Sequence, residues 1–204
     1  HRLDSAVFSI RRYDPIAGIV MTPWLRYSPH LPVSATLADA LALRSADWFE
    51  VPGSTPSFGL VRTAYWFRLQ LDGDSRHLRP LYLAVSYALL NHLDVYLVAS
   101  DGSTVHYQTG NALPFASRPL PHRHFLFPVE VSADEPVTVL LRVQTRGALQ
   151  VPVKLWDQTL LWVSDQTTLP AHSFFAAVML TIVLLNLLLY LGARDRVFLY
   201  YACY

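Results

Sequence analysis

The residues of this chain best suited to recognising a ligand are arginines placed on or beside short apolar runs. Arg68 and Arg142 each interrupt such a run, and Arg118 and Arg123 precede a third one. A guanidinium group binds a carboxylate through two parallel hydrogen bonds, so converging arginines would suit a carboxylate or an acidic sugar. The alternative is four separate solvated side chains whose stems cover apolar surface.

Trp66 is the main aromatic candidate, because an indole ring offers a flat apolar face on which a sugar ring can stack. Four tyrosines could extend such a platform: Tyr82, Tyr87, Tyr96 and Tyr107. Half of the side chains in any strand face the core, however. Each of these rings could therefore belong to the core or to the rim instead.

His122 and His124 are weak metal candidates. Two residues apart in a strand, they would lie on one face, and zinc could bind there with His106 or Asp94 as a third ligand. The sequence places no third ligand beside them. We therefore predict a structural role for both histidines, and neither a metal nor a cofactor.

The sequence gives little support to an enzyme. Glycoside hydrolysis needs two placed carboxylates, yet residues 1–165 hold only Glu50, Glu130 and Glu135, and most aspartates there fall in turn-like segments. No nucleophile elbow, phosphate loop or Cys/His pair occurs. A net charge of +1 offers no case for nucleic acid. The pattern favours binding over catalysis, with a membrane-anchored carbohydrate-active enzyme as the weaker alternative.

Short segments with strand-like patterns must position these residues. In Tyr65–Leu71, for example, Phe67, Leu69 and Leu71 alternate with Trp66, Arg68 and Gln70, so the apolar set should face a core. The predicted strands are Ile19–Leu25, Tyr65–Leu71, Leu81–Val85, Leu93–Ala99, Thr104–Thr109, Arg123–Val131, Val137–Thr145 and Val151–Trp156. A short helix is predicted at Leu37–Leu43, with Ser34 or Thr36 as its N-cap. We predict an all-β, jelly-roll-like antiparallel sandwich over residues 1–160.

A long apolar segment follows the predicted sandwich. No Asp, Glu, Lys or Arg occurs from Gln166 to Ala193, and a helix of roughly 20 apolar residues can cross a bilayer. A buried core helix is the alternative, but it would usually carry a polar stripe. We predict a membrane helix at residues 174–193, preceded by a juxtamembrane connector at residues 161–173 and followed at residues 197–204 by the truncated start of a second membrane helix.

Arg194 and Arg196 predict the orientation of this helix. They follow the apolar segment directly, and an excess of Lys and Arg marks the cytoplasmic end of a membrane helix. Residues 1–165 should therefore lie outside the cytoplasm.

The order of motifs resembles a known receptor family over roughly residues 20–204. The sequence resembles the type 2 extracellular domain, with the first membrane helix, of bacterial seven-transmembrane receptors with diverse intracellular signalling modules. The motifs are Trp48-Phe49, Gly59, Tyr65-Trp66-Phe67-Arg68, Leu93-Asp94-Val95-Tyr96-Leu97, Asp101-Gly102, Gly110, Arg118-Pro119, Phe127-Pro128, Leu141-Arg142-Val143 and Leu187-Leu188-Leu189-Tyr190.

This resemblance implies a sandwich similar to carbohydrate-binding modules, placed in the periplasm and anchored in the bacterial inner membrane. It implies sensing of a carbohydrate or other small molecule, with a histidine kinase or diguanylate cyclase as the output module beyond this chain. The membrane, the ligand and a second copy of the chain are the expected partners. A protein-binding or dimerisation ectodomain without a small-molecule ligand is the alternative.

Overall fold

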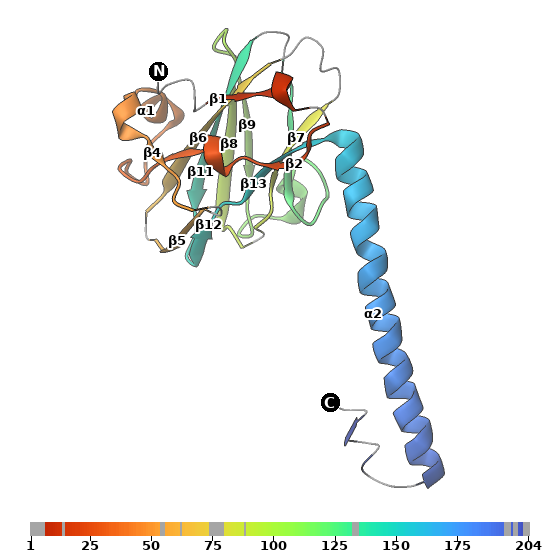
Figure 1. The fold of residues 1–204 in the computed structure, drawn as a ribbon. Helices are drawn as coiled ribbons and strands as arrows, with labels where there is room; N and C mark the ends of the chain where they lie inside the picture. The colour runs from red at the N-terminus through yellow and green to blue at the C-terminus, as the bar shows by residue number, and fades with distance from the viewer. Residues whose placement is uncertain are drawn as a thin grey trace. The chain divides into compact units, whose positions relative to one another are not determined.

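The computed structural model describes residues 7–13, 15–53, 56–61, 63–73, 80–87, 89–131, 135–193, 197 and 200–201. For residues 165–173 it describes the backbone only. The chain divides into two compact units, His1–Gln158 and Thr159–Tyr204. The first unit is built almost wholly of strands, and the second is helical (Figure 1).

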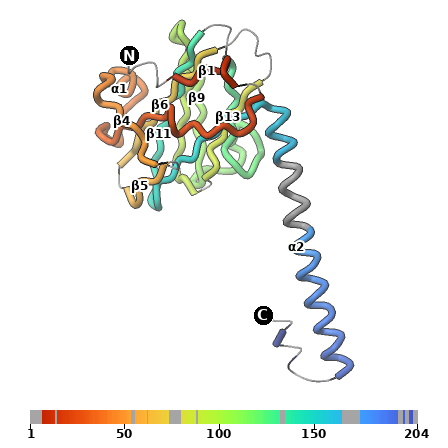
Figure 2. The backbone as a smooth tube through the Cα atoms, in the orientation of Figure 1, coloured from red at the N-terminus to blue at the C-terminus, as the bar shows by residue number. Residues whose placement is uncertain are grey.

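The larger sheet of the first unit has seven strands. Its hydrogen-bonded order is β4-β3-β6-β11-β8-β9. Strand β1 adds a parallel strand beside β6 (Figure 2). The other pairs in this sheet are antiparallel. The strands are β1 (Val7–Ser9), β3 (Arg26–Ser28), β4 (Phe49–Glu50), β6 (Tyr65–Asp72), β8 (His92–Val98), β9 (Thr104–Thr109) and β11 (Pro136–Gln144).

A smaller antiparallel sheet completes the sandwich, in the order β10-β7-β13-β2. Its strands are β2 (Ala17–Val20), β7 (Leu81–Val85), β10 (Phe125–Val129) and β13 (Val153–Asp157). Two further strands, β5 (Ser57–Leu60) and β12 (Ala148–Gln150), form a separate pair. The predicted sandwich is confirmed.

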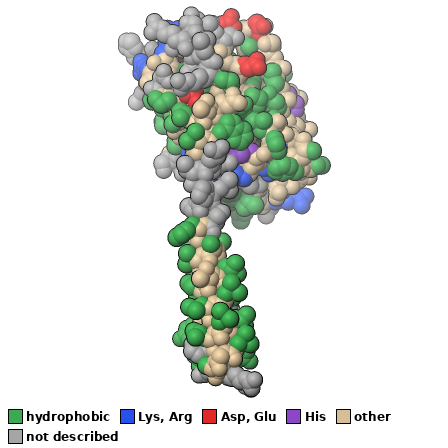
Figure 3. Space-filling model, turned by 90° about the vertical axis from the view of Figure 1, so that its right-hand side faces the viewer, with side chains coloured by type: hydrophobic (Ala, Val, Ile, Leu, Met, Phe, Trp, Pro, Cys, Tyr) green, Lys and Arg blue, Asp and Glu red, His purple; other side chains and the backbone are tan. Residues whose placement is uncertain are grey.

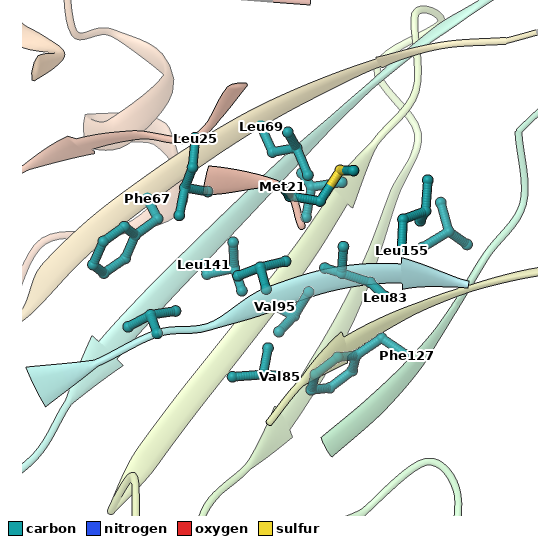
Figure 4. Packing of buried hydrophobic residues seen from close by; sticks show 14 of the residues in the cluster. Met21, Leu25, Phe67, Leu69, Leu83, Val85, Val95, Phe127, Leu141 and Leu155 are labelled. Carbon is teal, nitrogen blue, oxygen red and sulfur yellow. The ribbon is translucent and has the colours of Figure 1, made fainter. Parts of the chain in front are cut away.

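The core contains apolar side chains from both sheets (Figure 4). Phe67 and Leu69 of β6 and Leu141 of β11 come from the larger sheet, and Leu83 and Phe127 come from the smaller one. All are fully buried, and burying a side chain of this size contributes roughly 1.5–3 kcal/mol. The predicted inward face of β6 is therefore confirmed. Because side chains alternate along a strand, Trp66, Arg68 and Gln70 lie on the opposite, outer face of the sheet.

A second, smaller cluster lies on the outer face of the larger sheet. Trp66 and Leu140 pack there with Ala40 of helix α1 (Leu37–Leu41) and with Trp48. Thr36 is the N-cap of this helix, as one of the two predicted residues. Asp39 holds the cap, because its carboxylate accepts the Thr36 N–H at 2.7 Å and the Thr36 hydroxyl at 2.8 Å.

The predicted strand Ile19–Leu25 is wrong in its second half. Strand β2 ends at Val20, and a 3₁₀ turn occupies Thr22–Trp24. Pro23 has no N–H to offer a neighbouring strand, and its fixed φ suits the start of a helical turn. The strands β1, β3, β4, β5 and β12 were not predicted, because they are two to four residues long.

The second unit is dominated by helix α2 (Gln158–Ala193). The helix is continuous through the predicted connector, and Phe174–Ala193 is long and apolar enough to cross a membrane. Within Phe174–Ala193 the side chains are not buried in a core, and Figure 3 shows hydrophobic side chains along the visible side of the helix. Arg194 and Arg196 lie outside the described residues, as do most of residues 197–204.

Two polar side chains in the span hydrogen-bond to the backbone of the helix itself. The Thr181 hydroxyl donates to the Ala177 carbonyl at 2.8 Å, and the Asn186 amide donates to the Ile182 carbonyl at 2.9 Å. Back-bonding of this kind gives each side chain one partner within the helix, which lowers the cost of placing it in lipid.

Candidate ligand-binding site

Arg142 lies on the outer face of the larger sheet and is fully engaged there. Its Nη1 donates to the Asp94 carboxylate at 3.1 Å, and its Nη2 donates to the Val33 carbonyl at 2.7 Å. The Asp94 side chain is only 6% exposed, and its other oxygen lies 3.2 Å from His106 Nε2. Arg142 therefore compensates a buried carboxylate and ties the segment before α1 to the sheet.

Three aromatic rings extend this arrangement. Tyr96 stacks on His106 with ring centroids 4.3 Å apart, and on Trp66 at 6.0 Å. Burial raises the pKa of the Tyr96 hydroxyl, the Asp94 charge raises it further and the Arg142 charge opposes the shift. Trp66 has no exposed surface, so its ring offers no face to a sugar in this structure. We call Trp66, Asp94, Tyr96, His106 and Arg142 the outer-face cluster.

Arg68 lies on the same outer face of the sheet, in β6, where it is directly opposite Leu140 of β11. Its guanidinium carbon stands 6.0 Å from the centre of the Trp48 ring, and burial lowers the pKa of the group. It makes no hydrogen bond or ion pair with another described residue. Arg26 is directly opposite on β3 and pairs with Glu50 at 3.3 Å. Arg68 therefore remains a candidate for a single anion contact.

Arg118 and Arg123 lie elsewhere, in the segment that leads into β10. Arg118 donates to the carbonyls of His122 and Arg123, and its guanidinium carbon stands 4.7 Å and 4.6 Å from the ring centres of Phe115 and Phe125. These contacts fold the segment onto itself. The four arginines therefore do not converge: Arg68 and Arg142 lie in strands of the larger sheet, whereas Arg118 and Arg123 lie in the segment before β10.

His122 and His124 lie side by side. Their ring centroids are 5.4 Å apart, the His124 N–H donates to His122 Nδ1 at 3.0 Å, and His124 Nδ1 lies 3.0 Å from the Ser86 hydroxyl. Across the described part of the chain, no group of three His, Cys, Asp or Glu side chains could hold a metal ion. His106, proposed as a third ligand, is engaged by Asp94 on β8.

A hollow of about 520 Å³ lies where β8 begins and β11 ends. His92 and Gln144 are directly opposite each other in the two strands. We call this hollow the end pocket, and it is lined by Val61, Asn91, His92, Ala112, Gln144, Thr145 and Arg146. Its volume lies within the usual range for small-molecule sites, roughly 300–1,000 Å³.

Asn91 holds the frame of the end pocket. Its side-chain oxygen accepts the Thr145 hydroxyl at 3.1 Å and the Arg146 N–H at 2.8 Å, while its backbone carbonyl accepts the Ala112 N–H at 3.1 Å. Gly110 closes against the same carbonyl: with φ at +147°, a Cβ atom there would lie 2.1 Å from the Asn91 oxygen. Two separated chain segments, one at residues 110–112 and one at residues 145–146, thus meet at Asn91.

Three of the polar side chains that line the end pocket are unused. Among the described residues, none makes a hydrogen bond or ion pair with the side chains of His92, Gln144 or Arg146. No carboxylate is among the described residues that line the hollow. A fixed frame with free imidazole, amide and guanidinium groups can bind a polar or anionic small molecule.

Sequence reasoning missed the end pocket, because its described residues come from four separated segments and form no local motif. Arg146 and His92 carried the only available signal, as polar residues directly flanking strand-like runs. Two smaller hollows also occur. One, of about 330 Å³, brings Arg12 and Asp72 together and therefore mixes both charges, and the other, of about 250 Å³, includes Glu130.

Comparison with known proteins gives one family match. Residues 29–157, more than half of the chain, match the family described as 7TMR-DISM extracellular 2. Among solved structures, a family GH115 4-O-methyl-α-glucuronidase with specificity for decorated arabinogalactans is similar over 50% of this chain and 16% of its own, at 8% identity and a TM-score of 0.27. So low a score carries no argument, and the chain corresponds to a small part of that enzyme. No curated protein matches the chain.

Proposed function

This chain belongs to the 7TMR-DISM extracellular 2 family, and we propose that its sandwich senses a small molecule bound in the end pocket. The family assignment makes the first unit an extracellular sensor domain of a receptor, followed by a candidate membrane helix. The observation that carries the proposal is the end pocket itself: a hollow of ligand size, a frame fastened by Asn91, and free polar side chains.

The proposal extends to the setting of the receptor. The resemblance described above and the apolar helix support a multipass protein of the bacterial inner membrane, with residues 1–165 in the periplasm. Arg194 and Arg196 support this orientation from the sequence. A histidine kinase or diguanylate cyclase elsewhere in the parent protein would supply the output, so catalysis is not assigned to this chain.

A route for the signal follows from connectivity. Strand β13 ends at Asp157 and helix α2 begins at Gln158, so no residue separates the sandwich from the helix. The strand end is fastened to the sandwich, because the Asp157 N–H donates to the Ile16 carbonyl at 2.7 Å and the Gln158 N–H to the Pro80 carbonyl at 3.0 Å. A ligand can act on the helix only if it binds one packing of the sandwich more tightly than another.

Filling the end pocket tests the proposal. The full chain in detergent would be heated with a panel of small periplasmic solutes, in the native form and in the Ala112→Trp variant. We expect at least one solute to raise the melting temperature saturably in the native chain, since a ligand that binds only the folded state stabilises it. The indole of Ala112→Trp should abolish that increase.

Ala116→Trp is the matched control, because Ala116 is exposed and does not line the pocket. The increase should survive in this variant. If no solute stabilises the native chain, or if the increase persists in Ala112→Trp, ligand sensing in the end pocket is contradicted. The better-supported hypothesis would then be a protein-binding or dimerisation ectodomain.

A further inference from the structure

The charges around the end pocket are unbalanced. Arg146 and His92 line it, and no acidic residue is among its described lining residues. Asp94 lies two residues along β8 from His92 and on the same face, but Arg142 and His106 already occupy its two oxygens. The positive charge of Arg146 is therefore not neutralised by the strand that forms the pocket wall, and an anion would find an uncommitted partner there.

The donors gather around one place. His92 and Gln144 form a cross-strand pair, which holds their Cβ atoms roughly 4.5–5.5 Å apart. Arg146 follows Gln144 by two residues, and its own backbone N–H is held by Asn91 at 2.8 Å. The Arg146 side chain therefore extends from a fixed backbone position, close in the chain to Gln144 and its cross-strand partner His92. A fork suits a carboxylate, while an amide, which both donates and accepts, suits hydroxyl groups.

The remaining lining argues against an extended neutral glycan. Among the described lining residues only Val61 and Ala112 are apolar, and none is a phenylalanine, tyrosine or tryptophan. Neutral sugar rings depend largely on aromatic faces for apolar contact. Without such a face, affinity has to come from charge and hydrogen bonds, and a volume of about 520 Å³ suits a molecule of monosaccharide size.

Taken with the proposed sensing role, on which this step rests, the geometry points to a small hydroxylated carboxylate of the sugar-acid class as the ligand of the end pocket. Arg146 binds the carboxylate through its guanidinium fork. His92 and Gln144 bind hydroxyl groups, and Asn91 keeps the segments that carry them in place.

Two matched pairs of probes test the class of ligand. D-galacturonate differs from D-galactose, and D-gluconate from sorbitol, only by a carboxylate in place of a hydroxymethyl group. Calorimetric titration of the full chain in detergent should show binding of at least one acid. Its neutral match should bind at least about ten-fold more weakly, as expected for the loss of a charged hydrogen-bonded group.

Arg146→Gln is the decisive variant, because the Arg146 side chain is exposed and makes no hydrogen bond or ion pair with another described residue, so its replacement should leave the fold intact. We expect a loss of affinity for the acid of roughly 10- to 100-fold. Arg12→Gln is the matched control: Arg12 is also an exposed arginine at a hollow, and its replacement should leave the affinity unchanged. Added salt should weaken binding to the native chain, since an exposed charge pair is screened.

The contrary outcomes distinguish failure of the sugar-acid inference from failure of the proposed function. Equal binding of an acid and its neutral match, or binding that survives Arg146→Gln, overturns the sugar-acid inference. If another solute binds in a manner sensitive to Ala112→Trp while both acids fail, the inference is wrong and the proposed function stands. If nothing binds in the end pocket, both fail.

Discussion

Arg142 and Arg146 are four residues apart in the sequence, yet they differ in hydrogen bonding. The protein uses the guanidinium of Arg142, but no described residue bonds that of Arg146. Arg142 lies within β11, in the outer-face cluster, where both of its terminal nitrogens have partners. Arg146 lies two residues beyond the end of β11, at the end pocket, where its guanidinium has no partner among the described residues. One arginine supports the fold, and the other is available to a ligand.

The difference shows why residue type alone is a poor guide to a site. Arg142 was predicted as a ligand contact because it interrupts an apolar strand, but a buried carboxylate explains its presence. Trp66 was predicted for its flat ring, but the packing of α1 over the sheet explains it. A residue is a stronger candidate when the protein itself does not use its polar atoms.

The largest expected effect comes from breaking the outer-face cluster. Arg142→Met leaves the Asp94 carboxylate buried with only His106 beside it, and removing one partner of a buried ion pair typically destabilises by about 3 kcal/mol or more. Denaturant unfolding followed by tryptophan fluorescence measures this loss. The double variant Arg142→Met, Asp94→Leu should recover part of it, and a single-variant loss below about 0.5 kcal/mol would contradict the assignment.

A smaller loss is expected from the frame of the end pocket. Asn91→Ala removes the acceptor for the Thr145 hydroxyl and the Arg146 N–H, which should lower the free energy of unfolding by about 2 kcal/mol. Ligand binding should weaken as well, because the segments lose their common anchor. Asn111→Ala, an exposed neighbour, is the control, and equal losses in the two variants would speak against a framing role.

Acid should loosen α1 without disturbing the end pocket. The Thr36 backbone N–H, and then its hydroxyl, lower the pKa of Asp39 below its ordinary value of 3.8. A lowered folded-state pKa means that the stabilisation is present above the ordinary value and is lost as the pH falls through the folded one. Hydrogen exchange at the amides of Leu37–Leu41 should therefore rise, beyond the intrinsic change, as the pH drops below about 4. Asp39→Asn should abolish this dependence, and a native helix indifferent to pH in that range would refute it.

The smallest effect on stability is expected at Arg146. Arg146→Gln should change the free energy of unfolding by less than about 0.5 kcal/mol, because its side chain has no structural partner to lose. The same denaturant titration used for Arg142→Met provides the comparison. A loss as large as that of Arg142→Met would show that Arg146 is structural and would remove the contrast between the two regions.

The sequence predicted well whatever depends on periodicity. Alternation placed Phe67, Leu69 and Leu71 in the core, and the absence of charge from Gln166 to Ala193 indicated the apolar helix, whose side chains are exposed in the structure. Thr36 was recognised as a possible cap because its short side chain favours that position. Each of these features is decided by residues close together in the chain.

Features decided by residues far apart were not predicted. The end pocket is formed by residues that lie between Val61 and Arg146 in the sequence, and the sequence around any one of them does not predict the others. The pairing of Arg142 with Asp94 depends on the register of β11 against β8, which alternation leaves open. The strand predicted at Ile19–Leu25 failed for a local reason that was available, since Pro23 interrupts it.

The pairing of β2 with β13 has a consequence for the order in which the protein can be completed. Strand β2 precedes most of the sandwich in the chain, and its partner β13 is the last strand of the sandwich. Until Val153–Asp157 emerge, β2 and one edge of β7 have unpaired backbone groups, which invite pairing with another chain. A chain halted before Val153 should therefore aggregate, and the sandwich can close only when synthesis has nearly reached the apolar helix.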